Sequence, residues 1–176
     1  MKENTKKELY SWAKSILFAA VITFICRQFI FTPVTVLGQS MEPTFEENNK
    51  VVVSKISKIE HFDMIVFHSP FTDDEYLIKR VIGLPGDSLE VKNDVLYING
   101  KKYSEPYLQS NKEAILPEEK LTEDFKAKVP KNSLFVMGDN RLKSGDSRRF
   151  GFISKDSIIG EVKMRIFPLE EIGIPK

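Results

Sequence analysis

The segment from residue 12 to residue 31, WAKSILFAAVITFICRQFIF, is a run of 20 predominantly apolar residues. As a helix it would rise about 30 Å, which matches the hydrocarbon core of a bilayer. Its uncharged part, Ser15 to Cys26, is shorter and also fits a buried helix or the core of a cleaved targeting signal. However, Lys14 and Arg27 lie near its ends, where long side chains reach the interface, and no A-x-A cleavage pattern follows. We therefore expect one transmembrane helix over residues 12–31.

The charges on either side of this run predict its orientation. Four lysines precede the apolar core: Lys2, Lys6, Lys7 and Lys14. Behind the core, only Arg27 comes before Lys50. By the positive-inside rule, residues 1–11 form a short cytoplasmic N-terminus and residues 32–176 lie on the outer side of the membrane. The chain is then a single-pass protein of the cytoplasmic membrane, in contact with the lipid bilayer.

The composition fits one folded domain behind this helix. Of the 176 residues, 29% are charged and 41% are hydrophobic, and the formal net charge is +1. A domain of about 140 residues buries roughly two thirds of its unfolded surface and needs no covalent staples. Because Lys and Arg are spread along the chain, no binding of nucleic acid is expected. Cys26 is the only cysteine, which excludes an intramolecular disulfide.

The two histidines, His61 and His68, lie in EHFDMIVFHSP without the HExxH or CxxC neighbours that are typical of metal sites. We therefore expect no metal site, and a Ser/His triad has only slightly more support.

From residue 33 onward, short runs of β-forming residues alternate with turns, which predicts a mainly antiparallel β domain. The runs are TVLG, KVVVSKI, DMIVFHS, YLIKRVIGL, SLEVK, VLYI, SLFVM and IIGEVKMRIF. Hairpin turns at Asn93-Asp94 and Asn99-Gly100 predict a three-stranded meander, and GLPGD at 83–87 fits a type II turn. Residues 104–132 are charged and interrupted by proline, so we expect a long surface insertion with a helical turn and no catalytic role.

Ser40 lies in VLGQSMEPTF between turn-forming Gly38 and Pro43. Taken alone, this stretch favours a turn serine over a nucleophile. Evidence for chemistry at Ser40 has to come from other parts of the chain.

Lys79 is the first such evidence. In EYLIKRVIGLPGD, the alternation of a strand places Leu77, Lys79 and Val81 on one face and Arg80 on the other. Because the run is apolar on both faces, at least one cation is expected to lie against apolar surface. Desolvation lowers the pKa of a lysine and makes it a candidate general base, whereas arginine stays charged and is a structural candidate. The alternative is a strand lysine whose amine reaches solvent.

A third segment, FVMGDNRLKSGDSRRFG at 135–151, follows a short apolar strand. Asp and Asn after Gly bond readily to nearby backbone and hold a loop rigid. Its charged residues are candidates for ion pairs beneath the loop: Asp139, Arg141, Asp146 and Arg148. A solvated turn is the alternative, but the density of residues that fix geometry favours support of a site.

Three motifs occur in order behind the apolar segment: SMEPTF at 40–45, KRVIGLPGD at 79–87 and GDNRLKSGDSRRFG at 138–151. Together they resemble the bacterial type I signal peptidases, above all the short forms of Gram-positive organisms, over nearly the whole chain. The resemblance implies a Ser/Lys endopeptidase with a β-rich catalytic domain. It also implies removal of signal peptides from exported preproteins, after small residues in an Ala-x-Ala context, at the outer face of the cytoplasmic membrane. No metal or organic cofactor is implied, and we expect a monomer.

By motif position, the resemblance implies that Ser40 is the nucleophile and Lys79 the general base that takes its proton. The Ser40 backbone N–H would hold the oxyanion. Enterobacterial-type enzymes have a serine two positions before the nucleophile, which donates a second hydrogen bond. This chain has Gly38 there, so the second donor is unknown and has to be a backbone group or water.

The third motif implies supporting roles. Ser144 matches a serine that helps position the lysine. Asp146 and Arg148 match the supporting acid and base of the segment, and Asp139 and Arg141 belong to the same scaffold.

A second departure from the family pattern is FDMIVF at 62–67, where Gly usually precedes the aspartate. Phe62 leaves Asp63 in place, so we expect a local change of the turn rather than loss of activity. The substrate is expected to bind extended, in a groove lined by residues 36–40 and 76–82.

Two functions of other classes remain open at this point. The chain fits a membrane-tethered β domain that only binds a partner outside the cell, and it also fits a catalytically inactive relative of the peptidases. Both would tolerate loss of Ser40 and Lys79, whereas the peptidase interpretation forbids it.

Overall fold

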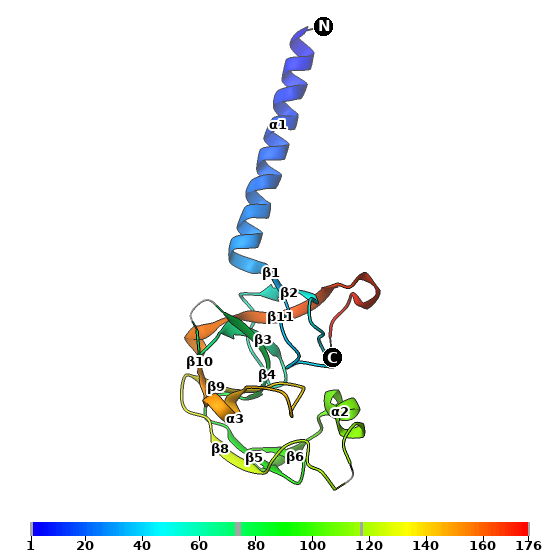
Figure 1. Ribbon diagram of the computed structural model, residues 1–176. Coiled ribbons are helices and arrows are strands. Elements are labelled where there is room, and N and C mark those ends of the chain that lie inside the picture. Colours follow the sequence, from blue (N-terminus) through cyan, green and yellow to red (C-terminus); the bar gives the residue numbers. More distant parts are fainter. Residues whose placement is uncertain (1, 73–74, 117, 176) are drawn as a thin grey trace.

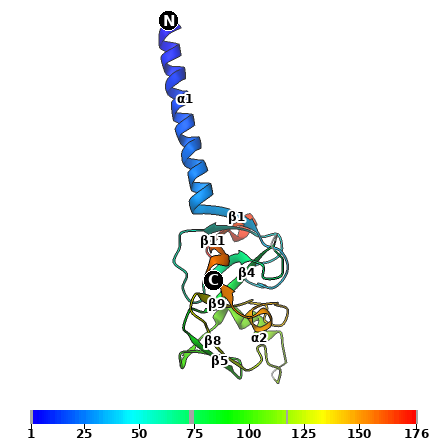
Figure 2. The same ribbon diagram turned by 90° about the vertical axis from the view of Figure 1, so that its left-hand side faces the viewer.

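The computed structural model describes residues 2–72, 75–116 and 118–175. A β domain carries one long helix that stands clear of it (Figures 1 and 2). Helix α1, Lys2–Ile25, continues through a π-helical turn, Cys26–Ile30, directly into strand β1, Phe31–Thr35. The predicted helix is confirmed, although Phe31 belongs to β1 and not to the helix.

From Ser15 to Ile25, helix α1 is apolar on all sides, and this part is not covered by the β domain. The stretch Lys7–Ile30 has a mean hydropathy of 1.7, and none of its most apolar part is buried. Large side chains such as Phe18 and Phe24 are about two-thirds exposed, at 68% and 66%. A helix that is hydrophobic all round normally lies in a protein core or in lipid, and here the protein supplies no core for it.

Seven strands form the larger sheet, in the order β1-β2-β11-β3-β4-β9-β10, and every neighbouring pair is antiparallel. After β1, its strands are β2 Lys50–Ser54, β3 Met64–His68, β4 Tyr76–Gly83, β9 Ser133–Met137, β10 Ile153–Ser154 and β11 Ile158–Phe167. The short helix α3, Ser147–Phe150, lies between β9 and β10 in the chain. The prediction of a mainly antiparallel β domain is confirmed.

Four strands form the smaller sheet, in the order β7-β6-β5-β8. They are β5 Ser88–Lys92, β6 Val95–Ile98, β7 Lys101–Tyr103 and β8 Phe125–Lys128. The predicted meander of β5, β6 and β7 is confirmed, because both two-residue turns have the positive φ values that type I′ hairpins need. The turn at 84–87 also forms, with Gly86 at φ +90° and a 3.0 Å hydrogen bond from the Asp87 N–H to the Leu84 carbonyl.

Apolar side chains of both sheets form the core between them. Ile82 of β4 and Met137 of β9 pack with Leu89 of β5 and Leu96 of β6, all at most 2% exposed. Two further clusters cover the two faces of the larger sheet. Strand β4 is therefore buried on both faces, which agrees with its apolar residues on each side of Lys79 and Arg80.

The expectation for residues 104–132 is only partly correct. The predicted helical turn is present as Pro106–Leu108 and α2, Gln109–Glu113. However, the segment is not only a surface excursion, because β8 pairs with β5 and Leu108 and Leu121 are buried. Strand β8 was not predicted, because its sequence FKAK has only two apolar residues, which alternate with lysines.

The strand expected at TVLG is also misplaced. The strand in this region is β1, which ends at Thr35, and the residues that follow form the loop around Ser40. β1 contains Pro33 and is an edge strand, where proline is tolerated.

Gly160 offers a test of how closely the larger sheet is packed. A β-carbon at this residue of β11 would lie 2.2 Å from the Ser54 carbonyl oxygen of β2. We expect Gly160→Ala to lower the free energy of unfolding by about 2–3 kcal/mol, because the backbone of β2 has to move. Gly145→Ala is the matched control, since a β-carbon at Gly145 meets nothing within 4 Å. Chemical denaturation measures both, and equal stabilities would contradict this packing.

Candidate active site

Ser40 lies in the loop between β1 and β2. Backbone hydrogen bonds and buried side chains of this loop hold it to the larger sheet. The Val36 N–H donates to the Asn49 carbonyl at 2.8 Å, and the Asn48 N–H donates to the Val36 carbonyl at 2.9 Å. Between these bonds, the side chains of Met41 and Phe45 are 1% and 0% exposed and anchor the loop in the core. The serine is therefore on a fixed loop rather than a free turn.

Lys79 of β4 points its amine at Ser40. The Lys79 Nζ lies 2.6 Å from the Ser40 Oγ and 3.0 Å from the Ile78 carbonyl oxygen. Lys79 is only 2% exposed, and this burial lowers its pKa from 10.5 to about 8, although the carboxylates of Asp146 and Asp139 act to raise it. The structure thus brings together the two residues singled out from separate motifs, and the amine loses its proton within reach of physiological pH.

Gly138 lets the third motif approach the serine. A β-carbon at Gly138 would lie 2.4 Å from the Ser40 carbonyl oxygen and 2.3 Å from the Ser144 Oγ. No real β-carbon makes contacts this short, so only glycine fits between the two serines. The Ser144 hydroxyl is buried and has no hydrogen-bond partner within the described part of the chain, Lys79 included. Gly138 was not among the predicted site residues, because many turns contain glycine for reasons unrelated to a site.

Asp146 and Arg148 form an ion pair within this segment. Arg148 donates from Nε and Nη2 to the two carboxylate oxygens of Asp146 at 2.8 and 2.7 Å. The Gly138 N–H donates to Asp146 at 3.0 Å. Burial acts to raise the pKa of Asp146, but the Arg148 guanidinium and the hydrogen bonds to the carboxylate, among them that of the Gly138 N–H, together hold this pKa below its ordinary value. A charged, fully buried Asp146 therefore ties the loop to the strand that precedes it.

The charged groups of Asp139 and Arg141 form ion pairs with residues outside the segment, not with each other. Asp139 accepts from Nε and Nη2 of Arg80 at 2.8 and 2.7 Å, and also from the Thr44 hydroxyl. Arg80, the structural candidate of the second motif, also donates to the Phe62 carbonyl at 2.9 Å. All four charged residues expected to form ion pairs beneath the loop thus do so: Asp146 with Arg148 inside the motif, and Asp139 with Arg80 and Arg141 with Glu105 outside it.

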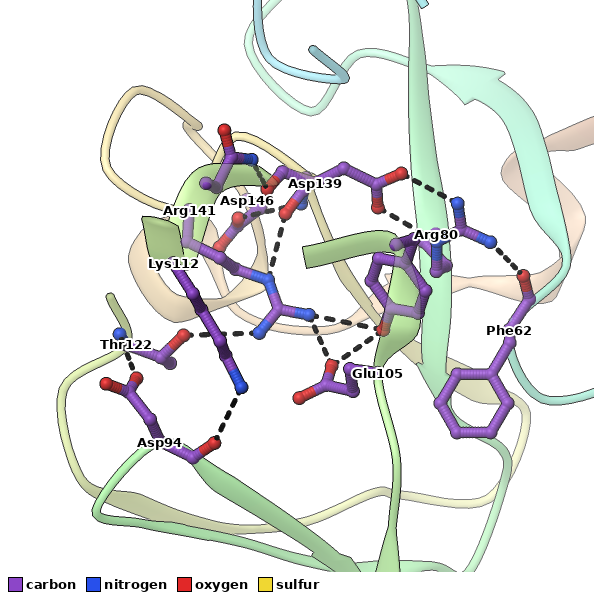
Figure 3. A network of polar contacts seen from close by, with 12 residues as sticks. Phe62, Arg80, Asp94, Glu105, Lys112, Thr122, Asp139, Arg141 and Asp146 are labelled. Carbon is purple, nitrogen blue, oxygen red and sulfur yellow. Dashed lines mark hydrogen bonds and ion pairs between the residues drawn. The ribbon is translucent and has the colours of Figure 1, made fainter. Parts of the chain in front are cut away.

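Arg141 joins the site to the insertion, as Figure 3 shows. Its Nη2 forms an ion pair with Glu105, and its Nη1 donates to the Thr122 hydroxyl at 3.2 Å. Tyr107 lies beside this pair, with the Arg80 guanidinium 3.9 Å from its ring centre. Burial next to Glu105 raises the pKa of Tyr107 well above its ordinary value, so its hydroxyl stays protonated and donates to Glu105 at 2.6 Å.

These contacts correct the view that the insertion has no part in the site. The residues of the insertion that contact the site were not predicted from the sequence, because a single Glu or Tyr in a charged stretch interrupted by proline belongs to no motif. The residues concerned are Glu105, Tyr107 and Thr122.

Phe62 takes a positive φ of 71°, a conformation that glycine adopts without strain. Its carbonyl is held by Arg80, and its ring packs at 5.7 Å from the Tyr103 ring. The departure from the glycine of the family pattern is therefore accommodated by packing, with Asp63 still in place.

The histidines lie outside this constellation. The His61 Nε2 is 2.7 Å from Asp87, which the β4–β5 turn carries, and His68 ends β3. No cluster of three metal-ligating side chains occurs among residues 2–72, 75–116 and 118–175.

A small cleft of about 30 Å³ opens beside Ser40 and Lys79. It is lined by the end of β1 and the loop after it, and by the first half of β4: Val34, Thr35, Val36, Leu37, Ser40, Met41, Tyr76, Leu77, Ile78 and Lys79. The two segments expected to line a groove thus do so, with β1 extending it.

Comparisons with known proteins identify the family. The profile described as "Signal peptidase, peptidase S26" matches residues 9–167. The chain is 44% identical to signal peptidase I S of Bacillus subtilis, over 96% of this chain and 95% of that protein. It is 43% identical to signal peptidase IB of Staphylococcus aureus, over 94% and 93%.

A solved structure agrees with these relatives. A crystal structure of a signal peptidase I from Enterococcus faecalis V583 matches with a TM-score of 0.58 and 43% identity, covering 60% of this chain and 97% of that one. The resemblance seen in the three motifs is therefore confirmed. With its β domain, its matched length and its relatives in agreement, the chain belongs to the signal peptidase family, peptidase S26, and is a serine peptidase that removes signal peptides.

Proposed function

We propose that this chain is a membrane-anchored signal peptidase in which Ser40 is the nucleophile and Lys79 the general base. The 2.6 Å contact between the Ser40 hydroxyl and a buried amine of lowered pKa carries the proposal. A hydroxyl becomes a nucleophile when a base within hydrogen-bond reach takes its proton. Lysine performs this role only when it is neutral, which burial makes accessible here.

The chemistry then runs in two halves. Neutral Lys79 takes the Ser40 proton as the oxygen attacks the scissile carbonyl, and the resulting ammonium gives that proton to the leaving amine. Water then attacks the acyl-enzyme with Lys79 again as base. The Ser40 N–H holds the oxyanion, and no side chain at Gly38 adds a second donor, so a backbone group or water completes the site.

Supporting roles follow from the ion pairs. Asp146, paired with Arg148, holds the loop that carries Ser144 to Gly138, beside the Ser40 backbone, and Asp139 holds the loop after Ser40 through Thr44. Ser144, buried without a partner, is available to orient the Lys79 amine. Arg141 fastens the same segment to the insertion.

The substrate is an exported preprotein with its signal peptide. Its backbone would lie extended between residues 34–37 and 76–79, adding to strand edges. The cleft beside Ser40 and Lys79 is small, at about 30 Å³, and its lining is mainly apolar, which favours small apolar side chains before the cut. This supports the Ala-x-Ala context.

The anchor places the enzyme beside such substrates. Residues 12–31 would span the membrane, residues 1–11 would be cytoplasmic, and residues 32–176 would form the extracytoplasmic catalytic domain, as a monomer. Tethering a protease at the surface where signal peptides emerge raises its effective concentration without new contacts. No metal or cofactor is required by this mechanism.

Loss of either catalytic side chain should abolish processing. We expect Ser40→Ala and Lys79→Ala to lower cleavage of a model preprotein by at least about a thousandfold, and Lys79→Arg to fail equally because a guanidinium keeps its proton. Cleavage by the full chain in lipid vesicles, followed on gels, measures this. Lys126→Arg, at a lysine side chain that is 76% exposed, is the matched control and should keep full activity. Cleavage of the preprotein by a folded Ser40→Ala, Lys79→Ala or Lys79→Arg variant would contradict the assignment.

The pH profile tests the base directly. Lys79 is protonated and inactive below its pKa, so kcat/KM should rise with pH through a single ionisation near 8 and then level off. Initial rates between pH 6 and 10, with circular dichroism to exclude unfolding, give the profile. A curve that is flat over this range would remove Lys79 from the role of base.

The orientation of the anchor can be tested with single cysteines. In a Cys26→Ala background, Thr5→Cys and Lys101→Cys place one thiol on each proposed side of the membrane. We expect a membrane-impermeant maleimide to label position 101 in intact bacterial cells and position 5 only after lysis. Labelling of position 5 in intact cells would reverse the proposed topology.

A further inference from the structure

We propose that Asn140 is a positioning residue of the oxyanion site, because it fixes the peptide group that carries the Ser40 N–H. The inference rests on the proposed function, in which that N–H binds the developing oxyanion.

Asn140 holds the backbone on both sides of Ser40. Its Nδ2 donates to the Gln39 carbonyl at 3.1 Å, and its backbone N–H donates to the Ser40 carbonyl at 3.1 Å. The Gln39 carbonyl accepts one other bond, from the Glu42 N–H at 3.2 Å. The Gln39 carbonyl and the Ser40 carbonyl are therefore both bound by one residue that lies 101 and 100 positions further along the chain.

The hydrogen bond from Asn140 to the Gln39 carbonyl also affects the oxyanion donor, the Ser40 N–H, through the geometry of the peptide bond. The Gln39 carbonyl and the Ser40 N–H belong to the same planar trans unit and point in opposite directions. A donor that fixes the carbonyl therefore also fixes the direction of the N–H. Within the described residues, the Ser40 N–H donates to no acceptor, so it is free for a ligand.

Asn140 is suited to this role because its side chain is a hydrogen-bond donor and because the backbone next to it is held rigidly. Only the amide nitrogen donates to a carbonyl oxygen, so an aspartate of the same shape would repel it. Its neighbour Asp139 is fully buried in the ion pair with Arg80, which gives the side chain a rigid base. Gly38 supplies no side-chain donor, so catalysis depends more strongly on the direction of the one N–H.

The test uses the full chain in lipid vesicles with Asn140→Ala and Asn140→Asp, a peptide substrate and the matching peptide aldehyde. The aldehyde forms a tetrahedral adduct whose oxygen occupies the oxyanion site. We expect Asn140→Ala to lower kcat about three- to tenfold, the size of one lost hydrogen bond, with KM unchanged within twofold. The inhibition constant of the aldehyde should rise by the same factor, and the midpoint of the pH profile should not move. Asn140→Asp should lose at least as much.

Asn111→Ala is the matched control. Its Nδ2 joins the Glu42 and Asp139 carbonyls at 3.2 and 2.8 Å, so it ties the same segments together without touching the Gln39 peptide. We expect a lower melting temperature but an aldehyde affinity within twofold of the unchanged chain. The inference is overturned if the two Asn140 variants keep kcat and aldehyde affinity within twofold. It is also overturned if they change KM alone, or if Asn111→Ala weakens the aldehyde equally. Cleavage that survives Ser40→Ala would instead overturn the proposed function.

Discussion

The site depends on keeping a lysine amine almost fully buried beside a serine hydroxyl. Burial disfavours the charged amine, whereas the nearby carboxylates of Asp146 and Asp139 favour it. Arginines bind both carboxylates at hydrogen-bond distance, which reduces their effect on Lys79. Unpaired, the same carboxylates would hold the proton on the amine. The two ion pairs therefore set the protonation of Lys79 as well as the shape of the loop.

A further ion pair ties the site to the insertion. The guanidinium groups of Arg80 and Arg141 lie 3.9 and 5.9 Å from the ring centre of Tyr107, and Arg141 pairs with Glu105. Buried ion pairs contribute little net stability, because desolvation offsets their attraction. Removing one partner is costly, however, since it leaves an uncompensated charge. The network thus acts as a constraint on geometry, in which the insertion and the catalytic loops fix one another.

The sequence was informative where a pattern and a local structure coincide. The meander and the 84–87 turn follow from Asn-Gly and Pro-Gly chemistry, and β4 follows from its apolar run. Ser40 and Lys79 are 39 positions apart, so only the three motifs together suggested that they meet. Glu105 and Tyr107 could not be predicted, because their partners are buried arginines whose positions follow from packing of the two sheets. β8 could not be recognised from two apolar residues without the neighbouring strand that it completes.

The junction between α1 and the β domain limits where the active site lies. The helix passes into β1 without a linker, since its π-helical turn ends at Ile30 and β1 begins at Phe31. Lys55 ties this junction twice, from its N–H to the Ile30 carbonyl and from its Nζ to the Gln28 carbonyl, both at 2.9 Å. With α1 as the proposed span, the domain has little freedom to move away from the bilayer. Ser40, nine residues after Phe31, then stays near the membrane surface, where a signal peptide presents its cleavage site. On the proposed topology, the missing linker would restrict cleavage to sites close to the bilayer.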